Sequence, residues 1–75
     1  MQTQQTLDAR GLNCPLPVLR TKKSLNTLQS GETLKVVATD PGALKDIASF
    51  CSQTGHALLA TQQSGGEYEF IIQKA

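Results

Sequence analysis

The sequence predicts a two-layer α/β (α+β) sandwich, in which two helices lie on one face of a four-stranded mixed sheet. Three observations lead to this prediction. Hydrophobic patterns follow one another in the order β-α-β-α-β-β. Proline or glycine separates each pair of neighbouring patterns. The chain has 75 residues, so we expect one domain, residues 1–75, with a thin core.

The first two elements are predicted to be a short strand and a helix. Thr3 to Asp8 show weak strand-like alternation, and a loop that contains Gly11 follows. Pro15 opens a helical pattern, because proline is favourable at the first helical position. The apolar side of that helix consists of Val18, Leu25 and Leu28, with Leu19 beside them. Ser30-Gly31 is predicted to close it, since glycine suits the left-handed turn past a helix end.

A second strand and a second helix follow. Thr33 to Thr39 alternate, and the residues expected on the buried face are Leu34, Val36 and Ala38. Asp40 and Pro41 predict the start of the second helix, with Asp40 as N-cap and Pro41 at the first helical position. The predicted apolar stripe of this helix is Leu44, Ile47, Ala48 and Cys51. Gly55 is expected to end it.

The last third of the chain predicts a hairpin. Its strands are His56 to Gln63 and Glu67 to Gln73, joined by a turn at Ser64-Gly65-Gly66. Tyr68, Phe70 and Ile72 should share one face. Because two helices cover only one face of the sheet, the other face should be partly exposed, with Val37 and Ile71 on it. That face is a candidate for partner docking.

Composition excludes several classes of function. The net charge is +1, which gives no general attraction to nucleic acid or membranes, and no apolar run is long enough to cross a bilayer. Met1 to Gln5 lack the features of a signal peptide, so we expect a cytoplasmic protein with free thiols. Cys14, Cys51 and His56 are too widely spaced to indicate a zinc site, and there is no CxxC motif. We therefore expect neither a metal nor a cofactor.

The segment Cys14-Pro15-Leu16-Pro17 is the candidate catalytic site. It lies where a loop becomes a helix, and both prolines fall in the first turn, where they break no helical hydrogen bond. Cys14 then lies at or beside the N-cap, where the helix dipole should lower the pKa of the thiol and favour the nucleophilic thiolate. The structural alternative is that Cys14 is a small apolar residue tucked under the loop.

Other residues have less specific roles. Arg10, Lys22 and Lys23 are candidate partner-docking residues near Cys14, although such charges also occur on any solvated face. Cys51 is expected in the core, because it falls on the apolar stripe of the second helix. The residue type and position of His56 leave its role open between a structural, a solvated and a catalytic one.

The stretch from Leu7 to Pro17 strongly resembles the signature of the TusA (SirA-like) sulfur-carrier family, which has Leu-Asp, Gly-Leu and then Cys-Pro-x-Pro heading a helix. The similarity continues over nearly the whole chain. Further matching segments are Gly31 to Leu34, Asp40-Pro41, Asp46-Ile47, Phe50-Cys51 and Gly55-His56. The family's fold is a two-layer α/β sandwich, in agreement with the element order.

The resemblance implies a sulfurtransferase-type carrier. Cys14 would accept sulfur from a cysteine desulfurase or another sulfur donor and pass it to a downstream acceptor protein, while Pro15 and Pro17 shape the helix start. The implied destination is 2-thiouridine in tRNA, or related sulfur metabolism. Some members carry an acidic residue between the two prolines, where this chain has Leu16, and this departure bears on which partners it meets.

Three rival functions belong to other classes. A regulatory interaction module of the same fold would do no sulfur chemistry and would tolerate replacement of Cys14. A small RNA-binding domain is disfavoured by the near-neutral charge and the few aromatic residues, so no direct nucleic-acid partner is expected. A peroxide-type redox enzyme would need a resolving cysteine close to Cys14, and Cys51 is expected to be buried.

Overall fold

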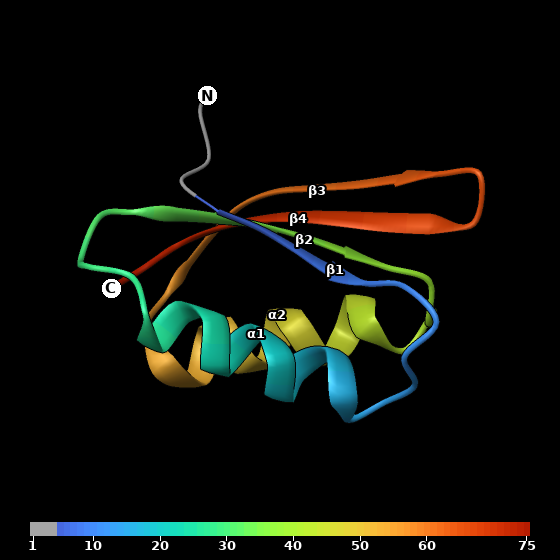
Figure 1. Ribbon diagram of the computed structural model, residues 1–75, viewed down its shortest axis with the longest axis horizontal. Helices are drawn as coiled ribbons and strands as arrows, with labels where there is room; N and C mark the ends of the chain where they lie inside the picture. The colour runs from blue at the N-terminus through green and yellow to red at the C-terminus, as the bar shows by residue number, and fades with distance from the viewer. Residues whose placement is uncertain (1–4) are drawn as a thin grey trace.

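The structure, a computed structural model, describes residues 5–75. Its elements are β1 Gln5–Ala9, α1 Leu16–Asn26, β2 Thr33–Ala38, α2 Ala43–Thr54, β3 Ala57–Ser64 and β4 Glu67–Gln73. Both helices lie on the same side of the sheet (Figure 1), so the predicted two-layer sandwich and its element order are confirmed. Thr3 and Gln4, which the sequence places in the first strand, lie outside the described residues.

The sheet is mixed and has the strand order β1-β2-β4-β3. β1 and β2 pair in parallel, and α1 connects them, whereas β4 pairs antiparallel with both β2 and β3. The β3–β4 turn contains Gly65 and Gly66 with φ of 57° and 82°, the left-handed conformations that a tight hairpin turn requires. In β3 the register with β4 shifts between Leu58 and Ala60.

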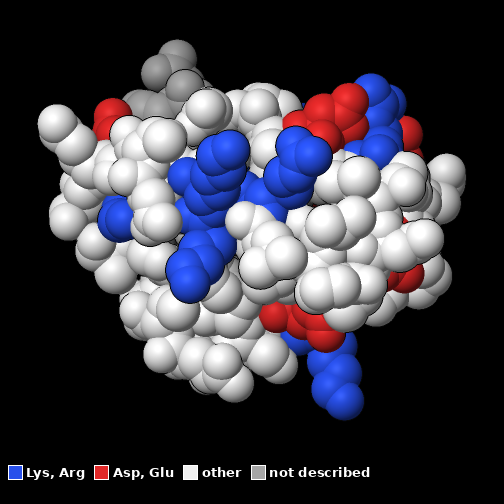
Figure 2. Space-filling model, turned by 60° about the horizontal axis from the view of Figure 1, so that its bottom comes forward, with Lys and Arg blue, Asp and Glu red and all other residues white. Residues whose placement is uncertain are grey.

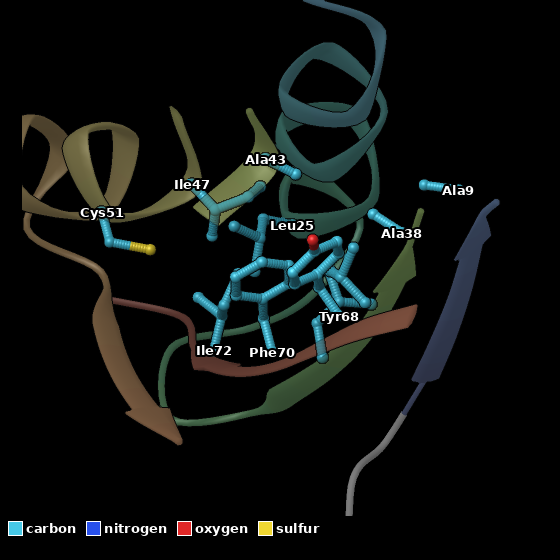
Figure 3. Close-up of a cluster of buried hydrophobic side chains, with 11 residues drawn as sticks. Ala9, Leu25, Ala38, Ala43, Ile47, Cys51, Tyr68, Phe70 and Ile72 are labelled. Atoms are coloured by element: carbon cyan, nitrogen blue, oxygen red, sulfur yellow. The ribbon is translucent and has the colours of Figure 1, made fainter. Parts of the chain in front are cut away.

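The core lies between the helices and the inner face of the sheet, as Figure 3 shows. The predicted alternation in both central strands is confirmed. Its buried residues are Leu34, Val36 and Ala38 of β2 and Tyr68, Phe70 and Ile72 of β4. The helices add Leu25, Ile47 and Cys51, all of them buried.

The first helix begins later and ends earlier than the sequence predicts. It begins at Leu16, one residue after the predicted start, so Pro15 is the N-cap residue and Pro17 is buried in the first turn. It ends at Asn26, and the next residue, Thr27, donates both its amide and its hydroxyl to the Ser24 carbonyl, at 3.1 and 2.7 Å. Gly31, with φ of 90°, makes the turn into β2 instead of closing the helix.

Two predictions about the second helix are wrong. It begins at Ala43, with Gly42 as N-cap, because the carboxylate of Asp40 accepts hydrogen bonds from the amides of Gly42 and Cys14 and does not cap the helix. The buried stripe is Ala43, Ile47 and Cys51, whereas Leu44 is half-buried and Ala48 is exposed. The predicted end is confirmed, since Gly55 adopts φ of 84°.

The outer face of the sheet is partly exposed, as predicted. Val37 and Ile71 alternate with the buried residues of β2 and β4 and are half-buried on that face. Leu59 of β3 is 40% exposed. Within residues 5–75, neither helix has the length and apolar character needed to cross a membrane.

Candidate functional site

Cys14 is exposed in the loop between β1 and α1, directly before the N-cap residue Pro15. The loop is fastened to the end of β2. The Gly11 amide donates to the Thr39 hydroxyl at 2.9 Å, and the Cys14 amide donates to Oδ2 of Asp40 at 2.9 Å. The loop that carries Cys14 is therefore anchored through its backbone, although its thiol is open to solvent.

The Cys14 thiol donates a hydrogen bond to Oδ2 of Asp46 in α2, with a sulfur–oxygen distance of 2.6 Å. Both residues line an open groove of about 260 Å³ between the start of α1 and α2. The lining residues are Cys14, Pro15, Val18, Asp46, Ser49, Phe50 and Gln53. The thiol is thus presented at the mouth of a shallow, mixed polar and apolar groove.

The electrostatic surroundings of Cys14 differ from the prediction. The hydrogen bond to Asp46, desolvation and the charges of Asp46 and Asp40 together raise the pKa of the Cys14 thiol, whereas the helix dipole was expected to lower it. The hydrogen bond to Asp46 is the largest of these causes. Pro15 and Pro17 remove amide donors from the helix start. The carboxylate of Asp46 is in direct contact with the sulfur, where its charge is strongest.

The basic candidates fall into two groups. Arg10 bonds to Asp8 at 2.9 Å and to Glu67 at 3.4 Å, so its charge is already balanced by two carboxylates. Lys22 and Lys23 are exposed on α1, together with Arg20. Figure 2 shows lysine and arginine side chains gathered on the helix side of the molecule.

The start of α1 also exposes apolar surface that the sequence analysis did not assign. Leu16 is 43% exposed and Leu19 is 54% exposed, on the same helix as the basic residues and just after Cys14. The sequence does indicate this exposure. Leu16 stands between the two prolines, and Leu19 lies to one side of the apolar stripe that contains Val18 and Leu25.

Neither Cys51 nor His56 lines the groove beside Cys14. Cys51 is buried, its sulfur points into the core cluster (Figure 3), and burial raises the pKa of its thiol. Nδ1 of His56 accepts the Ala75 amide at 3.0 Å, and its ring lies 5.7 Å from that of Phe50. Burial, and then the charge of Lys74, lower the pKa of His56. These contacts occupy Nδ1 of His56 and place its ring beside that of Phe50, which lines the groove.

Asp46 is the site residue that the sequence reasoning missed. In the sequence, Asp46-Ile47 is a segment that matches the family, and it predicts no role for Asp46. The pair is 32 residues apart in sequence, so only the packing of α2 beside the start of α1 reveals it. Among residues 5–75, no three His, Cys, Asp or Glu side chains gather in a way that could hold a metal ion.

Comparisons with known proteins agree with this fold. Residues 5–74 match the family described as Sulfurtransferase TusA. The chain is 54% identical over 71 residues to a sulfur carrier protein TusA of Allochromatium vinosum, covering 95% of this chain and 93% of that one. It is 46% identical to a putative sulfur carrier protein of Bacillus subtilis, covering 99% of each. The crystal structure of a SirA-like protein from Desulfitobacterium hafniense superposes with a TM-score of 0.83 at 26% identity, covering 93% of this chain and 96% of that one.

Proposed function

Because the chain belongs to the TusA family, we propose that it is a sulfur carrier that accepts persulfide sulfur on Cys14 and relays it to an acceptor protein. The observation that carries the proposal is the position of Cys14, an exposed thiol on an anchored loop at the mouth of an open groove. A carrier cysteine must reach into the sites of other proteins, and a loop end allows this.

The proposed loading step is an exchange between a thiol and a persulfide. The sulfur of Cys14, as thiolate, attacks the outer sulfur of the donor persulfide, a new S–S bond forms, and the donor's S–S bond breaks. The donor cysteine leaves with the electron pair of that bond and takes up the proton that Cys14 lost. The products are a donor thiol and a Cys14 persulfide, so no oxidant or reductant is consumed. Discharge to the acceptor cysteine repeats the same exchange.

The partners we propose are a cysteine desulfurase or another sulfur donor and a downstream acceptor protein. The destination of the sulfur is 2-thiouridine modification of tRNA or related sulfur metabolism, and the location is the cytosol, where thiols stay reduced. For docking, the proposal uses the exposed face of α1 beside Cys14, where basic Lys22 and Lys23 accompany Leu16 and Leu19. Arg10 contributes less, because Asp8 and Glu67 balance its charge.

The test is the intact mass of the protein after incubation with a cysteine desulfurase and cysteine. The expected result is a gain of one sulfur atom that a reductant removes, present in Cys51→Ala and absent in Cys14→Ser. Cys14 is exposed, so its serine variant should fold normally. Sulfur loading that persists in Cys14→Ser would contradict the assignment. No loading of the unaltered protein from any persulfide or thiosulfate donor would favour an interaction module of the same fold.

A further inference from the structure

The thiol of Cys14 does not stand free at its exposed position. It is held by the carboxylate of Asp46 at 2.6 Å, a short contact in which the sulfur is the donor. This bond exists only while the thiol keeps its proton, because a thiolate has no hydrogen to donate. It also turns the sulfur toward the α2 wall of the groove, where Ser49 and Phe50 lie.

The charged groups that face this sulfur are acidic. Asp46 reaches it from α2, and Asp40 lies in the segment before α2, where its carboxylate binds the Cys14 amide. On the α1 side, the groove lining is Cys14, Pro15 and Val18, which carry no positive charge. Among the described residues, the groups that shift the pKa of the Cys14 thiol are these two aspartates, together with desolvation, and all of them raise it. Helix α1 carries Arg20, Lys22 and Lys23, and none of them offsets the aspartates at the sulfur.

We propose that Asp46 is a positioning residue that keeps the Cys14 thiol of the unloaded carrier protonated and aimed into the groove, so that the free protein is a poor nucleophile. The biological meaning of this inference rests on the sulfur-carrier function proposed above. The thiolate is the form of cysteine that reacts with electrophiles and oxidants. The thiol of a carrier without bound sulfur is therefore protected from alkylation and oxidation while the protein moves between partners.

The effect of Asp46 should weaken once sulfur is loaded. In a Cys14 persulfide the outer sulfur carries the negative charge, and it is one S–S bond, about 2 Å, farther along the side chain than Sγ. The repulsion between two charges falls with distance. Asp46 therefore discriminates between the empty carrier, whose thiolate it suppresses, and the loaded carrier, whose outer sulfur it affects less.

The test is the rate at which iodoacetamide alkylates Cys14 in the isolated protein between about pH 6 and pH 10, followed by peptide mass. Asp46→Asn should move the midpoint of the pH profile to lower pH. Each unit of that shift raises the thiolate fraction at neutral pH about tenfold. The intrinsic nucleophilicity falls by a factor of about three per unit, so the net gain in rate is roughly three- to four-fold per unit.

The control variants separate charge at the sulfur from other effects. Glu67→Gln removes one negative charge on β4, away from the groups that act on Cys14, and should leave the profile unchanged. Asp46→Glu keeps a carboxylate and should hold the midpoint above that of Asp46→Asn. Asp46→Ser provides a second charge-removing variant if the asparagine protein does not fold.

The outcomes are decisive because alkylation needs no sulfur donor. A profile for Asp46→Asn that coincides with that of the unaltered protein would overturn the proposal, and so would an equal shift in Glu67→Gln. A lower midpoint in the asparagine variant alone supports it. If the unaltered protein never accepts sulfur, the proposed function fails, while the alkylation profile still reports whether Asp46 controls the thiol.

Discussion

The carboxylate of Asp40 accepts a hydrogen bond from the backbone amide of Cys14 at 2.9 Å, across 26 residues of sequence. The same side chain also accepts the amide of Gly42 at 3.3 Å. One aspartate thus fixes both the loop that carries the thiol and the turn from which α2 begins. The position of Cys14 relative to α2, and so to Asp46, depends on this link.

Replacement of Asp40 should loosen the Cys14 loop. In Asp40→Ala the amide of Cys14 loses a charged acceptor, and we expect the free energy of unfolding to fall by about 1–3 kcal/mol. Hydrogen exchange at the Cys14 amide should accelerate as well. Asp40→Asn keeps a carbonyl acceptor and should lose less stability. Unchanged exchange at this amide in the alanine variant would show that the bond does not hold the loop in solution.

Two leucines of α1 should respond very differently to truncation. Leu25 is fully buried and Leu19 is 54% exposed. Leu25→Ala should cost about 2–5 kcal/mol through lost burial and the cavity left behind. Leu19→Ala should change stability by less than about 0.5 kcal/mol. Urea unfolding of both variants checks this, and equal losses would mean that α1 packs with a different face.

Cys51 should matter for stability and not for sulfur transfer. Its side chain is 3% exposed in the core. Cys51→Ala should lower the free energy of unfolding by about 1 kcal/mol or more, because it leaves a small cavity. Sulfur loading on Cys14, measured by intact mass, should persist in this variant. Loss of loading in a folded Cys51→Ala protein would point to a direct role for the second thiol.

The pairing of Asp8 with Arg10 predicts a particular behaviour in acid. The hydrogen bond from the Arg10 side chain is the main cause that lowers the pKa of Asp8 from 3.8 to about 2. A lowered carboxylate pKa gives stability that is fully present above pH 3.8 and is lost as pH falls toward about 2. The Asp8 carboxyl should titrate near the lower value by NMR.

Arg10→Ala provides the control for that titration. Without the guanidinium, the titration midpoint of Asp8 should return toward 3.8. The part of the acid-induced fall in melting temperature that this pair causes between pH 3.8 and about 2 should then disappear. Because both side chains are more than half exposed, the change in melting temperature should be small and should shrink further in salt. An Asp8 midpoint that is unchanged in Arg10→Ala would exclude the pair as its cause.

The sequence predicts the elements of this fold well where periodicity alone decides them. Alternation in β2 and β4 indicates which side chains are buried, such as Val36 and Phe70, and Gly55 marks the end of α2. The other helix ends are predicted less well: α1 ends at Asn26, before Ser30-Gly31, and α2 begins at Ala43, three residues after Asp40. The Asp40 carboxylate binds the Cys14 amide across 26 residues of sequence, a contact that no local pattern shows.

The candidate site is predicted only in part, for a similar reason. The Cys-Pro-x-Pro segment locates Cys14 at a helix start, and the structure places it there. The direction of the shift in its pKa was predicted wrongly, because a helix dipole can be inferred locally, while a carboxylate 32 residues away can be found only from the packing of two helices. The surroundings of a thiol are a property of tertiary structure.

The register shift between Leu58 and Ala60 makes β3 a poor template for a further strand. β3 is an outer strand of the sheet, and a long regular outer strand invites side-to-side pairing between copies. An irregular one interrupts the ladder of amides and carbonyls that a second chain would have to match. We therefore expect pairing between copies to be disfavoured at the β3 edge, which would leave that side of the molecule open to the sulfur donor and acceptor that we propose.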